Sequence, residues 1–222
     1  MIVADRKPFD EIMGMIESCG KILLVGCNEC VTVCAAGGAK EVALLASQIR
    51  MKRKAEGRSV EVDEKTLERQ CDPEYVNPLA EMLEGYDAVL SLACGCGVQV
   101  VAETCQGLRV LPGLNTRFMG VTEEHGVWAE RCQGCGDCVL DRTCGICPVT
   151  RCAKSIMNGP CGGSRNGECE LRDGTPCAWQ LIIDRLKASG ELSRYGEIAK
   201  PRDWSTSRDG GPRKRTREDM RI

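Results

Sequence analysis

The sequence is poor in aromatic side chains and in long apolar runs. Phe, Tyr and Trp make up 4% of its 222 residues. No stretch approaches the roughly 18 apolar residues of a membrane-spanning helix. The opening segment MIVADRKPFDEIMGMIESCG carries charges where a signal peptide needs an apolar stretch. We therefore expect a cytoplasmic protein with no membrane span.

An excess of positive charge is also missing. Lys and Arg together number 30 and Asp and Glu number 32, which gives a formal net charge of -2. A protein that binds nucleic acid usually carries a basic face, and here the cysteine-rich part lacks interleaved basic and aromatic residues. We expect no nucleic-acid partner.

The sequence lacks the residue sets that enzymes use on substrates. Its one histidine, His125, lies in the polar stretch TEEHGV. No nucleophile-and-base set, carboxylate pair or phosphate-binding loop is evident, and the pattern G-x-G-x-x-G is absent. We therefore expect no catalytic residue in this chain.

Cysteine, in contrast, is abundant, with 17 residues. Thiols stay reduced in the cytosol, and an odd number fits poorly with complete disulfide pairing. Clustered cysteines then indicate ligands of a metal ion or of an iron–sulfur cluster. Cys19, Cys71 and Cys105 each stand alone in the sequence, and we expect them to be small buried apolar residues.

Residues 1–115 show an alternation of strands and helices. Apolar or alternating runs predict strands at 21–26, 59–63, 86–93 and 108–112. Helical patterns at 39–54, 76–85 and 98–105 separate them, the second beginning near Pro78. This order predicts an α/β domain with a Rossmann-like parallel sheet.

The rest of the chain has a different character. Residues 116–130 are polar and predict an irregular connector, and residues 131–195 predict a small cysteine-rich domain. That domain has little apolar periodicity, so metal bonds must supply much of its order. An amphipathic helix over 178–192 closes it. We expect residues 196–222 to form a basic, flexible tail.

The first group of candidate ligands is Cys27, Cys30 and Cys34, in a loop that follows the strand 21–26. The stretch CGCG after the strand 86–93 offers a fourth ligand, Cys94 or Cys96. Parallel sheets bind ligands beyond the carboxyl ends of their strands. Four thiolates in that place suit a four-iron four-sulfur cluster. A redox-active disulfide at Cys27 and Cys30 is the alternative.

The second group of candidates fills the cysteine-rich domain. It begins with the spacing of a bacterial ferredoxin and then departs from it; its members are Cys132, Cys135, Cys138, Cys144, Cys147, Cys152, Cys161, Cys169 and Cys177. Nine thiols suffice for two four-cysteine sites with one left over, or for one site plus free thiols. Zinc is an alternative to iron, with Cys132, Cys135, Cys144 and Cys147 as its ligands.

Long motifs in both halves resemble a known family. GCNECVTVCAAGGAKEVALLASQIR is similar to the iron–sulfur subunit of methylenetetrahydrofolate reductase of the acetyl-CoA pathway. RCQGCGDCVLDRTCGICPVTRCAKSIMNGPCGGSRNGECEL, followed by CAWQLIIDRL, resembles the C-terminal cysteine-rich domain of methylenetetrahydrofolate reductase. The resemblance spans roughly residues 5–195.

The resemblance implies a non-catalytic electron-transfer subunit. Two or three four-iron four-sulfur clusters would pass electrons from a donor complex or ferredoxin to the flavin of a separate TIM-barrel subunit. That partner would reduce methylenetetrahydrofolate to methyltetrahydrofolate. One alternative is a zinc-containing adaptor that docks the catalytic subunit. A corrinoid-dependent accessory protein is another, although the context of His125 does not match a cobalamin-binding signature.

Overall fold

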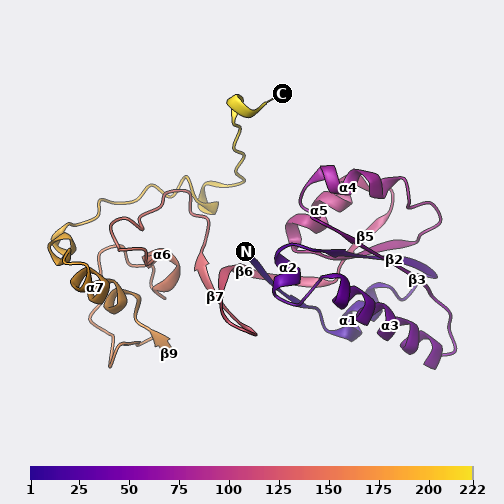
Figure 1. Ribbon diagram of the computed structural model, residues 1–222, viewed down its shortest axis with the longest axis horizontal. Helices are drawn as coiled ribbons and strands as arrows, with labels where there is room; N and C mark the ends of the chain where they lie inside the picture. Colours follow the sequence, from indigo (N-terminus) through magenta and orange to yellow (C-terminus); the bar gives the residue numbers. More distant parts are fainter. Residues whose placement is uncertain (222) are drawn as a thin grey trace. The chain divides into compact units, whose positions relative to one another are not determined.

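The computed structural model describes residues 1–221, which form two compact units, Met1–Trp128 and the described residues from Ala129 onward (Figure 1). Each unit is described by itself below. Among the residues described, no helix combines the length and apolarity needed to cross a lipid bilayer.

A parallel sheet of four strands forms the centre of the first unit. Its strands are β2 (Lys21–Cys27), β3 (Glu61–Leu67), β4 (Ala88–Leu92) and β5 (Arg109–Pro112). They lie in the order β3-β2-β4-β5, and every neighbouring pair is parallel. The structure thus confirms the predicted parallel sheet, although β3 begins two residues later and extends further than its expected range of 59–63.

Helices cover both faces of this sheet (Figure 1). They are α1 (Phe9–Met15), α2 (Cys30–Val33), α3 (Ala39–Ala55), α4 (Pro73–Ala80) and α5 (Gly95–Thr104). Because successive strand residues point to opposite faces, Ile22 and Leu24 enter one buried cluster while Leu23 and Val25 enter the other. Two apolar layers therefore hold the strands of the sheet in place.

The helix expected at 76–85 lies earlier in the chain than its sequence pattern suggested. It begins at Pro73, where a proline costs no intrahelical hydrogen bond, and the Asp72 side chain accepts a bond from the Glu74 amide. Pro78, the expected start, lies inside the helix.

A second, antiparallel sheet replaces the expected connector at 116–130. Strands β1 (Ile2–Arg6), β6 (Leu114–Glu124) and β7 (Val127–Cys132) lie in the order β1-β6-β7. Most of the β6 residues are exposed or half-buried. Main-chain pairing with β1 rather than side-chain burial defines this strand, so its polar sequence concealed it.

The second unit has few regular elements, namely α6 (Pro148–Arg151), β8 (Glu168–Cys169), β9 (Arg172–Pro176) and α7 (Ala178–Ala188), with 3-10 turns at Leu192–Gly196, Arg208–Gly210 and Glu218–Met220. Its buried apolar cluster consists of Ile146 with Trp179, Ile182 and Leu186 of α7. The expected closing helix is present but ends at Ala188. Such a small core leaves much of the order of this unit to other interactions.

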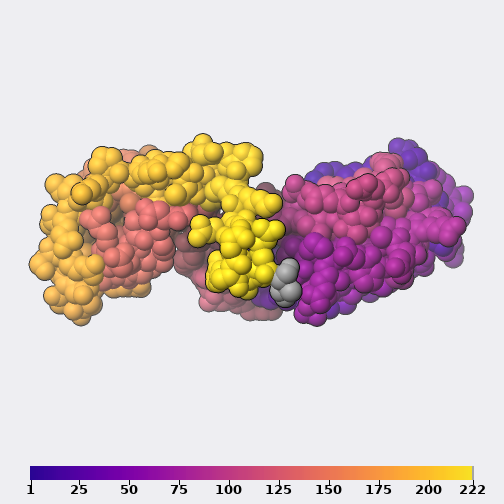
Figure 2. All heavy atoms as spheres, turned by 90° about the horizontal axis from the view of Figure 1, so that it is seen from above, coloured from indigo at the N-terminus to yellow at the C-terminus, as the bar shows by residue number. Residues whose placement is uncertain are grey.

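The segment expected to be a flexible tail contacts the second unit along much of its length. Asn158 exchanges two hydrogen bonds with the Ala199 backbone, at 3.0 and 2.6 Å, and Arg142 donates to the Glu197 carbonyl at 3.1 Å. In Figure 2 the yellow tail runs along residues coloured salmon and orange. Polar side chains binding backbone groups, which apolar periodicity does not reveal, hold the tail there. We call residues 198–213 the tail strap.

A single buried amide joins the strand ends of the parallel sheet. The Gln70 side chain is fully buried, and its Nε2 donates to the carbonyls of Val25 and Gly26, both at 2.9 Å. Its Oε1 accepts from the Ser91 hydroxyl of β4 at 2.7 Å. Gln70 therefore fixes the loop after β3 to the ends of β2 and β4.

Replacing Gln70 by alanine removes three buried hydrogen bonds and leaves the partner groups unpaired. We expect Gln70→Ala to lower the free energy of unfolding of the sheet by about 2 to 4 kcal/mol. Hydrogen exchange at the β2 and β4 amides measures this quantity. Gln99→Ala is the control, because Gln99 is exposed and its amide makes one bond, to Gly95. Equal effects of the two substitutions would contradict the role given to Gln70.

Candidate functional site

Two of the candidate cysteines lie at the carboxyl edge of the parallel sheet. Cys27 is the last residue of β2, and Cys94 is the N-cap residue of α5, just beyond β4. Since β2 and β4 are adjacent and parallel, their carboxyl ends meet. The amide of Gly95 donates to the Thr116 hydroxyl at 2.8 Å, which anchors the start of α5 to β6.

Cys71 lies at the same edge, contrary to the expectation of a solitary buried residue. The Cys27 thiol points to the Glu68 carbonyl at 3.9 Å, in the loop that carries Cys71. A Cβ on Gly97 would lie 2.8 Å from Gln70 Cβ, so α5 packs directly on that loop. Cys71 itself is exposed. The end of β2 and the loops after β3 and β4 thus each bring one cysteine to a common edge.

Electrostatics reflect this proximity. Partial desolvation of the sulfur raises the pKa of the Cys71 thiol, and the neighbouring Cys94 and Cys27 raise it further. Burial and the nearby Cys94 likewise raise the pKa of the Cys96 thiol. A negative charge on one sulfur disfavours a second one beside it. A cation placed among these sulfurs would reverse that effect, because a coordinating thiol loses its proton.

Cys34 and Cys30 are placed differently. The Cys34 thiol is buried in the apolar cluster on one face of the sheet and points to the carbonyls of Ala4 (3.5 Å) and Val31 (3.6 Å). Burial raises its pKa. Cys30 is the first residue of α2 and is half-buried. This geometry favours Cys71 over Cys34 as a partner of Cys27 and Cys94.

The second unit arranges its cysteines around two hollows. The first hollow, of about 210 Å³, is lined by Cys132, Cys135, Cys138 and Cys147. We call residues 132–138 the first cysteine loop. Within it the Gly134 amide donates to the Cys132 sulfur at 3.3 Å. Backbone N–H groups that point at sulfur stabilise negative charge there.

A smaller hollow, of about 20 Å³, is lined by Cys152, Cys161, Cys169 and Cys177. The Gly163 amide donates to the Cys161 sulfur at 3.4 Å, which repeats the arrangement of the first hollow. The Lys154 ammonium lies beside Cys161 and pairs with Glu170, and the Glu170 side chain raises the pKa of Lys154. An N–H donor thus accompanies this group of thiols as well, and here a cation lies beside it.

Cys144 belongs to neither hollow. Its sulfur lies 3.4 Å from Glu191 Oε2 and 3.8 Å from the Ser189 hydroxyl, against the end of α7. The nine cysteines therefore divide into four, four and one. The structure groups Cys138, rather than Cys144, with Cys132, Cys135 and Cys147 of the proposed zinc set.

Around the two hollows the donor chemistry suits a thiolate-bound centre, because sulfur-rich linings are accompanied there by backbone N–H donors and nearby cations. Within residues 1–221, no three thiol, imidazole or carboxylate groups are already arranged to hold a metal ion. The metal and cluster assignments therefore remain predictions.

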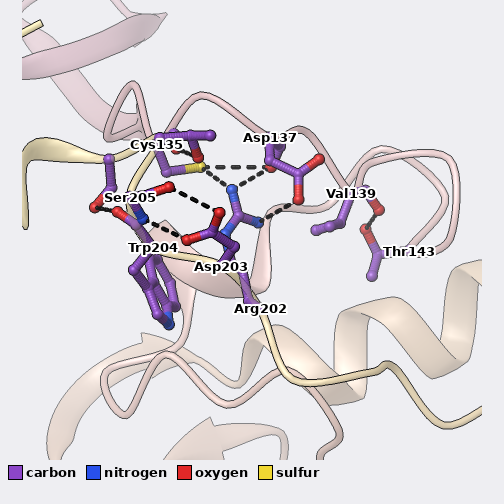
Figure 3. Close-up of polar contacts among 10 residues, drawn as sticks. Cys135, Asp137, Val139, Thr143, Arg202, Asp203, Trp204 and Ser205 are labelled. Carbon is purple, nitrogen blue, oxygen red and sulfur yellow. Dashed lines mark hydrogen bonds and ion pairs between the residues drawn. The ribbon is translucent and has the colours of Figure 1, made fainter. Parts of the chain in front are cut away.

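Sequence reasoning missed Arg202, whose guanidinium lies at the Cys135 sulfur (Figure 3). Periodicity gives no signal for such a residue, because it acts through one side chain in an irregular segment. Cys71 had a weak signal, since it follows a predicted strand whose carboxyl end shares the edge with Cys27.

Substitution of Cys71 and of Cys34, with Cys105 as the control, tests which of the two belongs to the ligand set of the first unit. We expect Cys71→Ser to lose the metal of one centre, as measured by elemental analysis of the full chain purified without oxygen. Cys105→Ser should keep it, because Cys105 is buried among apolar side chains. Cys34→Ser should also keep it. Full metal content in Cys71→Ser together with a loss in Cys34→Ser would restore the ligand set predicted from the spacing.

Comparisons with curated proteins and with solved structures give little information about this chain. No curated protein matches the chain. A solved structure, an extracellular ligand-binding receptor from Verminephrobacter eiseniae ef01-2, aligns with a TM-score of 0.33 and 12% identity over 43% of this chain. The aligned part spans 26% of the receptor chain, and so weak a likeness carries no argument.

Residues 111–205 match the family described as "Methylene-tetrahydrofolate reductase C terminal". The match begins at the end of β5 and extends into the tail strap, so it covers the whole cysteine-rich part of the second unit. It covers less than half of the chain. The match supports a relation between this chain and methylenetetrahydrofolate reductase.

Proposed function

We propose that this chain is the electron-transfer subunit of a methylenetetrahydrofolate reductase. It would carry four-iron four-sulfur clusters and pass electrons from a redox partner to the flavin of a catalytic subunit. The observation that carries the proposal is the grouping of cysteines at three places, one at the sheet edge and two around the hollows of the second unit. The match of residues 111–205 supports the choice of reductase.

The proposed division of labour gives the folate chemistry to the catalytic subunit. His125, the one histidine of the sequence, is exposed in the turn between β6 and β7. The folate carbon would then be reduced on the catalytic subunit. This chain would bind the clusters, keep water from them and hold them within electron-transfer range of a partner. When bound, the clusters supply one-electron chemistry over a wide range of potentials.

The proposed ligands follow the three groups. At the sheet edge they are Cys27, Cys71 and Cys94, with Cys30 or Cys96 as the fourth. In the second unit they are the four cysteines of each hollow. The N–H donors of Gly134 and Gly163 would stabilise charge on the sulfurs of their own groups.

A zinc-containing adaptor is the second candidate, and the small core of the second unit favours it. With one buried cluster, around Ile146 and α7, this unit needs metal bonds for much of its stability. Four thiols around one hollow suit tetrahedral zinc as well as an iron–sulfur cluster. In this alternative the second unit would dock the catalytic subunit without carrying electrons.

A transfer assay distinguishes these functions. The chain and the flavin subunit are purified as one complex, an electron donor is added without oxygen, and flavin reduction is followed by absorbance. We expect Cys138→Ser to slow flavin reduction more than about tenfold, because a ligand is lost. Cys144→Ser is the matched control and should behave like the wild type, since Cys144 lies outside both hollows. Undiminished transfer in Cys138→Ser, with the complex intact, would favour the adaptor.

A further inference from the structure

The tail strap packs directly on the backbone of the first cysteine loop. The Thr206 hydroxyl donates to the Cys135 carbonyl at 3.0 Å, and Arg213 donates to the carbonyls of Gly134 and Thr206. A Cβ on Gly136 would lie 2.4 Å from the backbone carbonyl oxygen of Thr206, and Gly136 itself has a φ of +85°. Glycine is required where two backbones approach this closely.

Arg202 is the buried residue of the strap. Its side chain is 3% exposed, and Nη2 donates to the Cys135 sulfur at 3.1 Å and to the Asp137 carbonyl (Figure 3). The guanidinium also lies over the Trp204 ring, 4.9 Å from its centroid. These contacts together hold the charge beside Cys135, which lines the first hollow.

Part of this guanidinium has no hydrogen-bond partner. Nε and Nη1 are buried, and neither makes a hydrogen bond within the part of the chain that the structure describes. The Asp137 carboxylate is 3.9 Å from Nη1, which is close enough for an ion pair and too far for a hydrogen bond. The exposed Asp137 carboxylate offsets part of the charge, but buried donors without hydrogen bonds on a cation stay costly unless a further anion lies close by.

A loaded thiolate centre is such an anion. Four thiolates carry more negative charge than a divalent zinc ion, or than the core of a four-iron cluster, carries positive charge. The centre keeps a net negative charge in either case. Cys135, one of the four cysteines of the first hollow, already lies against Arg202.

We propose that Arg202 is the counter-ion of the centre held by Cys132, Cys135, Cys138 and Cys147. This assignment rests on the proposed function, which places a metal centre there. The guanidinium offsets the excess negative charge of the thiolates and slows metal loss. In an iron–sulfur centre it also stabilises the reduced form, which carries one more negative charge, and so raises the reduction potential. Arg202 is a positioning residue that holds charge at the sulfur.

Metal release to an excess of chelator tests the proposal on the full chain as purified. Arg202→Gln keeps an N–H donor but loses the charge, and we expect release about 10- to 100-fold faster than from the wild type. Arg202→Lys keeps the charge and should stay close to the wild-type rate. Arg217→Gln is the matched control, because Arg217 is exposed and pairs with Asp219.

Thr206→Val tests whether the strap is only a mechanical cover. It removes the bond to Cys135 but keeps the charge, so a counter-ion role predicts near-wild-type release. If the Arg202→Gln chain does not fold, fast release from Thr206→Val would still overturn the counter-ion role.

Three results would overturn the proposal. Metal release from Arg202→Gln at the wild-type rate would show that the charge is not needed. Equally fast release from Arg202→Lys, Arg202→Gln and Thr206→Val would mean that the strap only holds the loop in place and that the charge has no role. A wild-type chain without metal would overturn the proposed function as well, whereas unchanged release from a metal-bearing chain would overturn this inference alone.

Discussion

The buried side chain of Gln70 determines where the cysteines of the first unit can meet. Its amide binds the end of β2 on one side and Ser91 of β4 on the other, so the loop after β3 cannot move away from the sheet edge. Without this connection the loop that carries Cys71 would lose its buried hydrogen bonds to the sheet. With it, three adjacent strand ends each contribute a thiol to one place. The candidate centre of the first unit thus depends on a hydrogen-bond pattern made by a residue that is itself no ligand.

The grouped thiols also limit where negative charge can form. Thiols collected in a partly desolvated place resist ionisation, as the raised pKa of Cys71 and of Cys96 shows. In the second unit, amide donors point at the sulfurs of Cys132 and Cys161, and a cation lies beside each group of thiols. Its apolar core is small, so bonds to a metal would contribute both order and function.

The sequence predicted the elements whose order depends on apolar periodicity. β2, α3 and α7 each bury a regular apolar pattern, and each lies close to its expected range. β6 and β7 were missed because main-chain pairing defines them. Spacing alone left the nine cysteines of the second unit undivided. The fold divides them, because residues as distant in sequence as Cys152 and Cys177 line one hollow. Cys71 and Arg202 were missed because tertiary contacts, through Gln70 and the first cysteine loop, give them their place.

Iron, acid-labile sulfide and zinc, measured per chain on protein purified without oxygen, test the central claim most directly. Four cysteines at each of three places predict about twelve iron and twelve sulfide with little zinc, or about eight of each if zinc occupies one hollow. Zinc alone, with no sulfide, would contradict an electron-transfer role and leave a docking adaptor.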